Sequence, residues 1–207
     1  MRTRALPEVL RLALAAAALL LAGAATADDL DVLMSELARA PHGTVSFHER
    51  QFLAVLDKPV ESSGILIYRP PDHLEKRTLK PRPASLIADG DVLTVQRGRR
   101  QHVLRLSEFP QAAPLIDCIR ATLAGDRAGL EAHFDVQMSG TLDDWRLVLT
   151  PKAAPADSRT GTAAAADGGA TSVRKIEISG TRGQLRRVEI LQSDADRSEL
   201  LILPPPA

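Results

Sequence analysis

The chain has a single cysteine, few aromatic residues and no excess of charge of either sign. Cys118 is alone among 207 residues, so no intramolecular disulfide can form. Aromatic residues make up 3% of the chain, so a large apolar surface must be built from Leu, Ile, Val and Ala. The chain has 26 Lys and Arg against 26 Asp and Glu. Because a nucleic-acid-binding protein usually carries a basic excess, this balance argues against a nucleic-acid partner.

The first 27 residues have the three parts of a secretory signal peptide. A basic start with Arg2 and Arg4 precedes an uncharged run of Leu, Ala and one Gly from Leu12 to Ala25. The small residues Ala25 to Ala27 then provide a site for signal peptidase. A membrane-spanning helix needs about 20 apolar residues, and Arg11 leaves this run shorter than that. We therefore expect cleavage after Ala27 and a mature protein in the periplasm.

The expected mature chain, residues 28–207, has the length of a single domain. It contains 180 of the 207 residues, which is enough to bury a core. No cysteine lies at the cleavage site, where Asp28 is the first residue after Ala27, so we do not expect the protein to be a lipoprotein itself. Residues 152–172 are rich in Ala, Gly, Thr and Asp and lack hydrophobic periodicity. This composition predicts a flexible insertion between two strands.

Three segments have the apolar spacing of helices. Asp29 to Arg39 is amphipathic, with Leu and Met at positions i, i+3, i+4 and i+7. Pro110 to Ala124 is a second helix, for which Gly125 is a good C-cap. Asp126 can cap a shorter helix that continues through Leu130 to Phe134.

The middle helix has one apolar side. Asp117 and Arg120 fall on its other side. The apolar side spans an arc of about 100° and consists of Ala112, Leu115, Ile116, Ile119 and Leu123. Such a helix must bury this arc, and the concave side of a curled sheet is the natural place.

Short runs with a period of two fill most of the remaining chain and are separated by turn residues. We predict strands at Thr44–Leu56, Gly64–Tyr68, Leu74–Leu79, Ala84–Ala88, Val92–Gln96, Gln101–Leu106, Phe134–Met138, Trp145–Thr150, Val173–Ser179, Gln184–Leu191 and Glu199–Leu203. A twisted antiparallel sheet of about ten or eleven strands does not stay flat but curls. The pattern therefore predicts a mainly β, α+β fold with a sheet as the wall and helices as the lid. Either a packed core or an apolar cavity lies between them.

No group of residues has the spacing of a catalytic or metal site. Cys118 could act as a nucleophile with His102 or His133, but no local motif supports catalysis, so we interpret it as a small helix residue. The five histidines lack the spacing of metal ligands. No glycine-rich phosphate loop leads from a strand into a helix. We therefore expect neither an enzyme nor a metal or cofactor.

Several short strings occur in a characteristic order. They are Phe47 to Phe52, with Phe at both ends; Gly64 to Pro70, which ends in Arg-Pro; the Asp89-Gly90 turn; Leu147 to Lys152, which ends in Pro-Lys; and Asp194 to Ser198. In this order and spacing they resemble the outer-membrane lipoprotein carrier protein (LolA) family. The resemblance extends over nearly all of the mature chain.

The resemblance implies both a fold and a function. Members of the family are half-open antiparallel β-barrels with a helical lid over an apolar cavity. They shield the acyl chains of lipoproteins between an inner-membrane release complex and an outer-membrane acceptor, without catalytic residues or a cofactor. By this resemblance we expect a monomer. The arginine of the family's Arg-Pro motif, which hydrogen-bonds to the lid and tunes its opening, corresponds to Arg69. We expect the cavity and lid to be lined by Phe47, Phe52, Leu66, Tyr68, Leu115, Ile116, Ile119 and Leu123.

The cargo and the class of function stay open at this point. With few aromatic residues and the insertion at 152–172, the chain looks like a divergent branch of the family, so a glycolipid or another acylated molecule is an alternative cargo. An envelope lipid-sensing or protein-interaction module of the same fold is the alternative function. Native mass spectrometry of protein purified from the periplasm would discriminate them, because a carrier should travel with a lipid.

Overall fold

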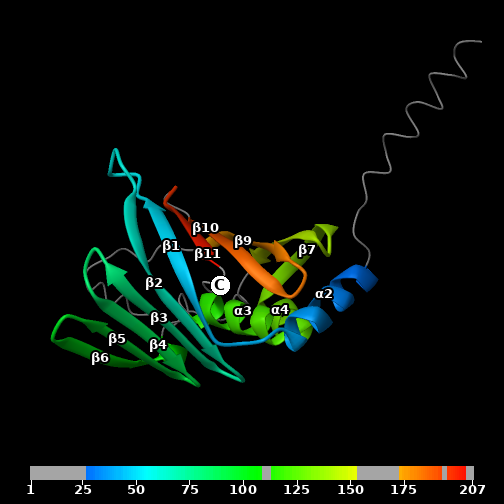
Figure 1. The fold of residues 1–207 in the computed structure, drawn as a ribbon, viewed down its shortest axis with the longest axis horizontal. Helices are drawn as coiled ribbons and strands as arrows, with labels where there is room; N and C mark the ends of the chain where they lie inside the picture. Colours follow the sequence, from blue (N-terminus) through cyan, green and yellow to red (C-terminus); the bar gives the residue numbers. More distant parts are fainter. Residues whose placement is uncertain (1–26, 109–112, 153–172, 193–194, 204–207) are drawn as a thin grey trace, which may run out of the picture.

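The computed structural model describes residues 27–108, 113–152, 173–192 and 195–203 (Figure 1). The expected signal peptide, apart from Ala27, and the expected insertion, apart from Lys152, lie outside these ranges. Within them, one 11-stranded antiparallel sheet curls around helices that lie on one of its faces. Its outermost strands do not pair with each other, so the barrel is half-open. The expected mainly β half-barrel with covering helices is confirmed.

The strands form two groups along the chain. The first group is β1 (Thr44–Phe52), β2 (Val60–Arg69), β3 (His73–Lys80), β4 (Ala84–Asp89), β5 (Val92–Arg97) and β6 (Arg100–Arg105). The second group is β7 (Phe134–Thr141), β8 (Asp144–Pro151), β9 (Val173–Thr181), β10 (Gln184–Gln192) and β11 (Arg197–Leu203). Consecutive strands are neighbours within each group, and pairing of β1 with β11 joins the two groups. The edges of the sheet are therefore β6 and β7.

The helices are α2 (Ala27–Arg39), α3 (Ala113–Ala124) and α4 (Arg127–His133), and a short 3-10 helix, η1 (Leu106–Glu108), follows β6. The face of the sheet toward these helices is called the inner face below. Gly125 ends α3 with a positive φ of 66°, and the amide of Asp126 donates to the carbonyl of Ala121 at 2.8 Å. The Asp126 carboxylate in turn accepts a hydrogen bond from the amide of Gly129 at 3.0 Å and caps α4.

The apolar side chains form two clusters that meet at α3. The main cluster joins α2, α4 and one side of α3 to the inner face of β7–β10, and it contains Trp145, which is fully buried. The indole nitrogen of Trp145 donates to the carbonyl of Arg182 at 2.7 Å, so the only polar atom of this side chain is satisfied. The second cluster lies between α3 and the first group of strands. Its buried members are Tyr68, Leu74, Ala88, Leu93, Leu106 and Ile116.

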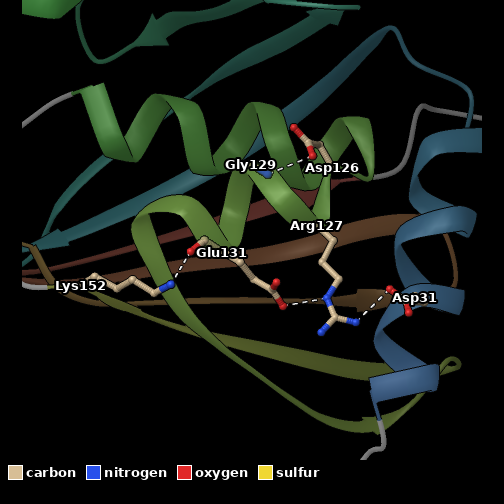
Figure 2. A network of polar contacts seen from close by, with 6 residues as sticks. All are labelled: Asp31, Asp126, Arg127, Gly129, Glu131 and Lys152. Atoms are coloured by element: carbon tan, nitrogen blue, oxygen red, sulfur yellow. Dashed lines mark hydrogen bonds and ion pairs between the residues drawn. The ribbon is translucent and has the colours of Figure 1, made fainter.

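Polar contacts tie α2 to α4 outside the clusters (Figure 2). The Arg127 guanidinium lies 2.9 Å from Asp31 on α2 and 2.7 Å from Glu131 on its own helix. Hydrogen bonds to these two carboxylates raise the pKa of Arg127. Lys152, at the end of β8, donates to the backbone carbonyl of Glu131. These contacts join α2, α4 and the second group of strands.

Most predicted elements are found within a few residues of their expected bounds. The first strand differs, because it ends at Phe52 instead of continuing to Leu56. The chain must reverse there, since Gln51 pairs with Val60, and the amide of Leu56 closes a turn by donating to the carbonyl of Leu53 at 2.9 Å. In the described ranges, no helix has the length and apolar character needed to cross a membrane.

Candidate functional site

The strand register determines which side chains of the first group face the helices. Tyr68 of β2 pairs with Leu74 of β3, and both belong to the second cluster with α3. Leu66, two residues before Tyr68, therefore also faces inward, whereas Ile65 and Ile67 face outward. Across the next pair, Phe47 lies opposite Gly64 and is almost fully buried on the same inner face.

Helix α3 covers one end of this inner face. Ile116 is buried in the second cluster against side chains of β2–β6. Ile119 and Leu123 pack against both clusters, and Leu115 packs against the main cluster. The apolar side of α3 therefore lies between the two groups of strands, as a lid on a curled sheet should.

Seven of the residues expected to line the cavity and the lid lie either on the inner face of the sheet or on α3. Phe47, Leu66 and Tyr68 lie on the inner face, and Leu115, Ile116, Ile119 and Leu123 lie on α3. Phe52 is placed elsewhere. It is five positions after Phe47 in the same strand, so it faces outward, where the guanidinium groups of Arg50 and Arg197 lie 5.0 and 4.3 Å from its ring centre.

The expected latch residue, Arg69, also faces outward. It directly follows the inward Tyr68 at the end of β2, and its side chain is exposed. Among the described residues, no hydrogen bond or ion pair of its side chain is recorded. The contact between the lid and the rim of the sheet comes instead from Arg120 of α3, which donates to the backbone carbonyl of Gly90 at 3.1 Å.

Arg120 is a nearly buried cation with few partners. Its side chain is 11% exposed, it donates to the carbonyl of Gly90, and it lies 3.6 Å from the Asp117 carboxylate. Among the described residues, its Nε and Nη2 atoms are buried and have no hydrogen-bond partner. Helical spacing predicts that Arg120 lies on the polar side of the helix. It does not reveal that the Asp89-Gly90 turn contacts that side.

Tyr68 lies at the rim of the sheet, near the Arg120 guanidinium. Its hydroxyl donates to the carbonyl of Pro71 at 3.2 Å, and its ring meets that of His42 edge-on, with 4.9 Å between the ring centres. Burial raises the pKa of the Tyr68 hydroxyl, although the nearby Arg120 charge opposes this shift. The hydroxyl is therefore neutral at physiological pH and acts as a hydrogen-bond donor.

The other end of the inner face is hollowed by a pocket of about 260 Å³. Residues of β1–β5 line it: Glu49, Gln51, Val60, Ser62, Lys76, Thr78, Ala84, Ser85, Leu86, Val95, Gln96 and Arg97. Most of these residues are polar or charged. The pocket therefore differs in character from the apolar end beneath α3.

A buried ion pair lies in this pocket. The Lys76 ammonium is 2.7 Å from both carboxylate oxygens of Glu49, whose side chain is 8% exposed. Ser62 and Ser198 also donate to this carboxylate, at 2.8 and 3.2 Å. Burial acts to raise the pKa of Glu49, but the Lys76 charge and the hydrogen bonds outweigh it and leave the pKa below its ordinary value. Glu49 is therefore ionised at neutral pH.

This ion pair is not among the residues predicted above, although the sequence contains a signal for it. Glu49 and Gln51 continue the inward series that begins with Val45 and Phe47, and a carboxylate at such a position needs a partner. That the partner is Lys76 follows only from the pairing of β2 with β1 and β3.

Cys118 has the properties of a buried structural residue. It is 1% exposed, and burial, together with the nearby Asp117 carboxylate, raises the pKa of its thiol to about 12. The thiol donates to the carbonyl of Leu115 at 3.2 Å and is protonated at neutral pH. Across the part of the chain that the structure describes, no cluster of three or more His, Cys, Asp or Glu could hold a metal ion.

Comparisons with known proteins point to one family. No curated protein matches the chain. Two similar solved structures are the LolA superfamily protein NE2245 from Nitrosomonas europaea and the lipoprotein LppX of Mycobacterium tuberculosis. The first is 13% identical over 87% of this chain and 93% of that chain, with a TM-score of 0.44. The second is 14% identical over 88% and 99%, with a TM-score of 0.43. The family model described as "Outer membrane lipoprotein carrier protein LolA-like" matches residues 22–200, a range that contains all or part of every element described above.

Proposed function

Because the chain belongs to the family of LolA-like outer membrane lipoprotein carrier proteins, we propose that it binds the acyl chain of a lipid or lipoprotein between α3 and the inner face of the sheet. The carrier works in the periplasm, after removal of the signal peptide. It takes its cargo from an inner-membrane release complex and delivers it to an outer-membrane acceptor. It acts as a monomer, and no step of this cycle requires catalysis or a cofactor.

The division of the apolar side chains into two clusters that meet at α3 is the observation that supports this proposal best. Ile116 of α3 packs against β2–β6 in the second cluster, whereas Cys118 and Ala121 of α3 belong to the main cluster with α2, α4 and β7–β10. If α3 moves away from the first group of strands, an apolar surface becomes available while most of the main cluster stays packed. An acyl chain can then take the place of the helix side chains.

The energetics of this exchange suit a carrier. Moving an acyl chain out of water gains about 0.8 kcal/mol per CH₂, so a long chain cannot cross an aqueous space unaided. Displacing α3 costs its contacts with the second cluster, and bound cargo replaces these contacts with its own. Because the two terms oppose each other, net binding stays weak enough for release.

Binding of a fluorescent fatty acid to paired variants of β2 tests the proposal. Leu66 and Ile65 are adjacent, half-buried and point to opposite faces, and neither belongs to the two buried clusters. We expect saturable binding to the wild type, weaker binding to Leu66→Gln and unchanged binding to Ile65→Gln. The absence of saturable binding to the wild type at micromolar protein, or equal losses in both variants, would argue against acyl-chain binding at this face.

A further inference from the structure

The inner face of β1–β5 has two ends of different chemistry. Beneath α3 it is apolar, through Tyr68, Leu74, Ala88 and Leu93. At the other end of the same strands, the pocket of about 260 Å³ is lined mostly by polar and charged side chains. This volume lies below the range of about 300–1,000 Å³ usual for drug-sized ligands, so it suits a small polar group better than a whole lipid.

The two ends are continuous. Leu86 and Val95 line the pocket and also pack against the second cluster. They are directly opposite each other on β4 and β5, and Leu86 is opposite Lys76 on β3. An apolar chain that leaves the pocket therefore passes over Leu86 and Val95 into the region covered by α3.

The charges of the inner face favour an anion at the pocket end. From the register, the charged inward positions of β1–β6 are Glu49, Lys76, Arg97 and Arg100. Three cations therefore face one carboxylate, and that carboxylate is already occupied by Lys76, Ser62 and Ser198. The Arg97 side chain is exposed, and among the described residues no ion pair is recorded for it.

The Glu49–Lys76 pair gives the pocket a fixed donor. Its two charges are largely removed from water, an arrangement that contributes little net stability compared with apolar packing. The Lys76 ammonium donates to both carboxylate oxygens of Glu49, and 28% of the Lys76 side chain is exposed. Because an ammonium has three donors, a further acceptor in the pocket can bind to it without breaking the pair.

We propose that this pocket binds the anionic head group of an amphiphile, a phosphate or a carboxylate, while the acyl chain lies beneath α3. Lys76 and Arg97 donate to the head group, Glu49 holds Lys76 in place, and Leu86 and Val95 guide the start of the chain. This inference rests on the proposed function and adds a head-group preference to it.

Displacement of the neutral dye Nile red by two detergents with the same tail tests this preference. We expect dodecyl phosphate to displace the dye from the wild type at a lower concentration than dodecyl glucoside. Inorganic phosphate alone should not bind measurably, because it lacks the tail. If phosphate alone bound as tightly as dodecyl phosphate, the pocket would be a free-anion site and the amphiphile proposal would be wrong.

Variants then assign the preference to the pocket. Glu49→Gln combined with Lys76→Gln removes the ammonium without leaving a buried unpaired charge. Arg97→Gln changes an exposed side chain, so we expect this variant to fold like the wild type. Each should weaken the binding of dodecyl phosphate about tenfold, the effect of one charge-assisted hydrogen bond. The affinity for dodecyl glucoside should stay unchanged. Arg99→Gln, in the exposed turn beside Arg97 but outside the pocket lining, is the matched control and should change neither.

The outcomes separate this inference from the proposed function. Equal affinity of the wild type for both detergents, or a preference that survives in the variants, overturns the head-group site while acyl binding stands. If neither detergent displaces the dye, the proposed function fails, and the head-group site fails with it.

Discussion

Arg120 is the residue through which α3 contacts the rim of the sheet. Its hydrogen bond to Gly90 is charge-assisted and contributes about 1.5–3 kcal/mol. Against this, two of its buried nitrogen atoms have no partner among the described residues, and each costs about 1–3 kcal/mol of desolvation. The opposing terms are of similar size, so the closed position of α3 is held only weakly by this residue.

We therefore expect Arg120→Leu to leave stability within about 1 kcal/mol of the wild type or to increase it, because the desolvation cost disappears with the hydrogen bond. A more stable closed state should also weaken fatty-acid binding. Arg69→Leu, which changes an exposed side chain, should affect neither property. Urea unfolding and fatty-acid titration measure both effects. A stability loss above 2 kcal/mol in Arg120→Leu, or a larger binding defect in Arg69→Leu, would contradict this account of the latch.

Glu49 should make stability depend on pH in a defined direction. Its pKa is lowered in the folded protein, so the unfolded chain binds a proton more tightly at this position. The stabilising contribution of ionised Glu49 is fully present above the pKa of a glutamate in the unfolded chain, about 4.3. It is lost as the pH falls through the lower pKa of Glu49 in the folded protein. The free energy of unfolding should thus fall more steeply below pH 4.5 in the wild type than in the Glu49→Gln/Lys76→Gln variant. Glu61→Gln is the control. The Glu61 carboxylate is exposed and lies 3.8 Å from the Arg50 guanidinium, beyond hydrogen-bond distance, so this variant should retain the wild-type slope.

At the level of elements, the junction between α3 and α4 is also a contact with α2. Gly125 has a positive φ, and a Cβ atom there would lie 2.1 Å from the carbonyl oxygen of Met34 and 2.8 Å from Cβ of Ala38. This glycine therefore serves both the backbone turn and the close approach of the two helices.

Substitution of this glycine separates the two requirements. Gly98, in the turn between β5 and β6, also has a positive φ, of 61°, but a Cβ atom there would meet nothing within 4 Å. Gly98→Ala should cost only the left-handed backbone strain, about 1–2 kcal/mol. Gly125→Ala should cost more, because α2 must also shift. Thermal unfolding of both variants measures the difference. Equal losses would mean that α2 adapts freely to α3.

The elements themselves could be predicted from the sequence, because hydrophobic period and turn residues are local signals. The helix that ends at Gly125 and the hairpin at Asp89-Gly90 are examples. The inward direction of Phe47 and the outward direction of Phe52 follow from strand alternation once one strand is taken to cover both. The pairing of Glu49 with Lys76 and the contact of Arg120 with Gly90 depend on which strands are neighbours and on where α3 sits. These features come from tertiary packing, which the local pattern of a single sequence does not encode.

At the level of the whole molecule, the half-barrel is asymmetric. The second group of strands contains fully buried side chains, Leu147 and Leu149 on β8 and Ile176 and Ile178 on β9, beneath α2 and α4. Among the described α-helices, α3 alone covers the first group, over one end of its inner face, and the pocket opens at the other end. In the proposed mode of binding, the second group of strands keeps its packing, and the contacts exchanged for a ligand belong to the first group.

This asymmetry predicts two levels of local stability. Amides of β8 and β9 should exchange with solvent only through global unfolding, because their side chains form the best-packed part of the main cluster. Amides of α3 should exchange through a smaller opening, since Leu115, Ile119 and Leu123 are only half-buried, and the helix meets the first group of strands through the second cluster and the hydrogen bond from Arg120 to Gly90. Hydrogen exchange in increasing, sub-denaturing urea distinguishes the two, because global opening has a steep urea dependence and local opening a shallow one. If α3 and β8 exchanged with the same free energy and slope, the lid and the core would be one cooperative unit, and α3 could not be displaced without unfolding the protein.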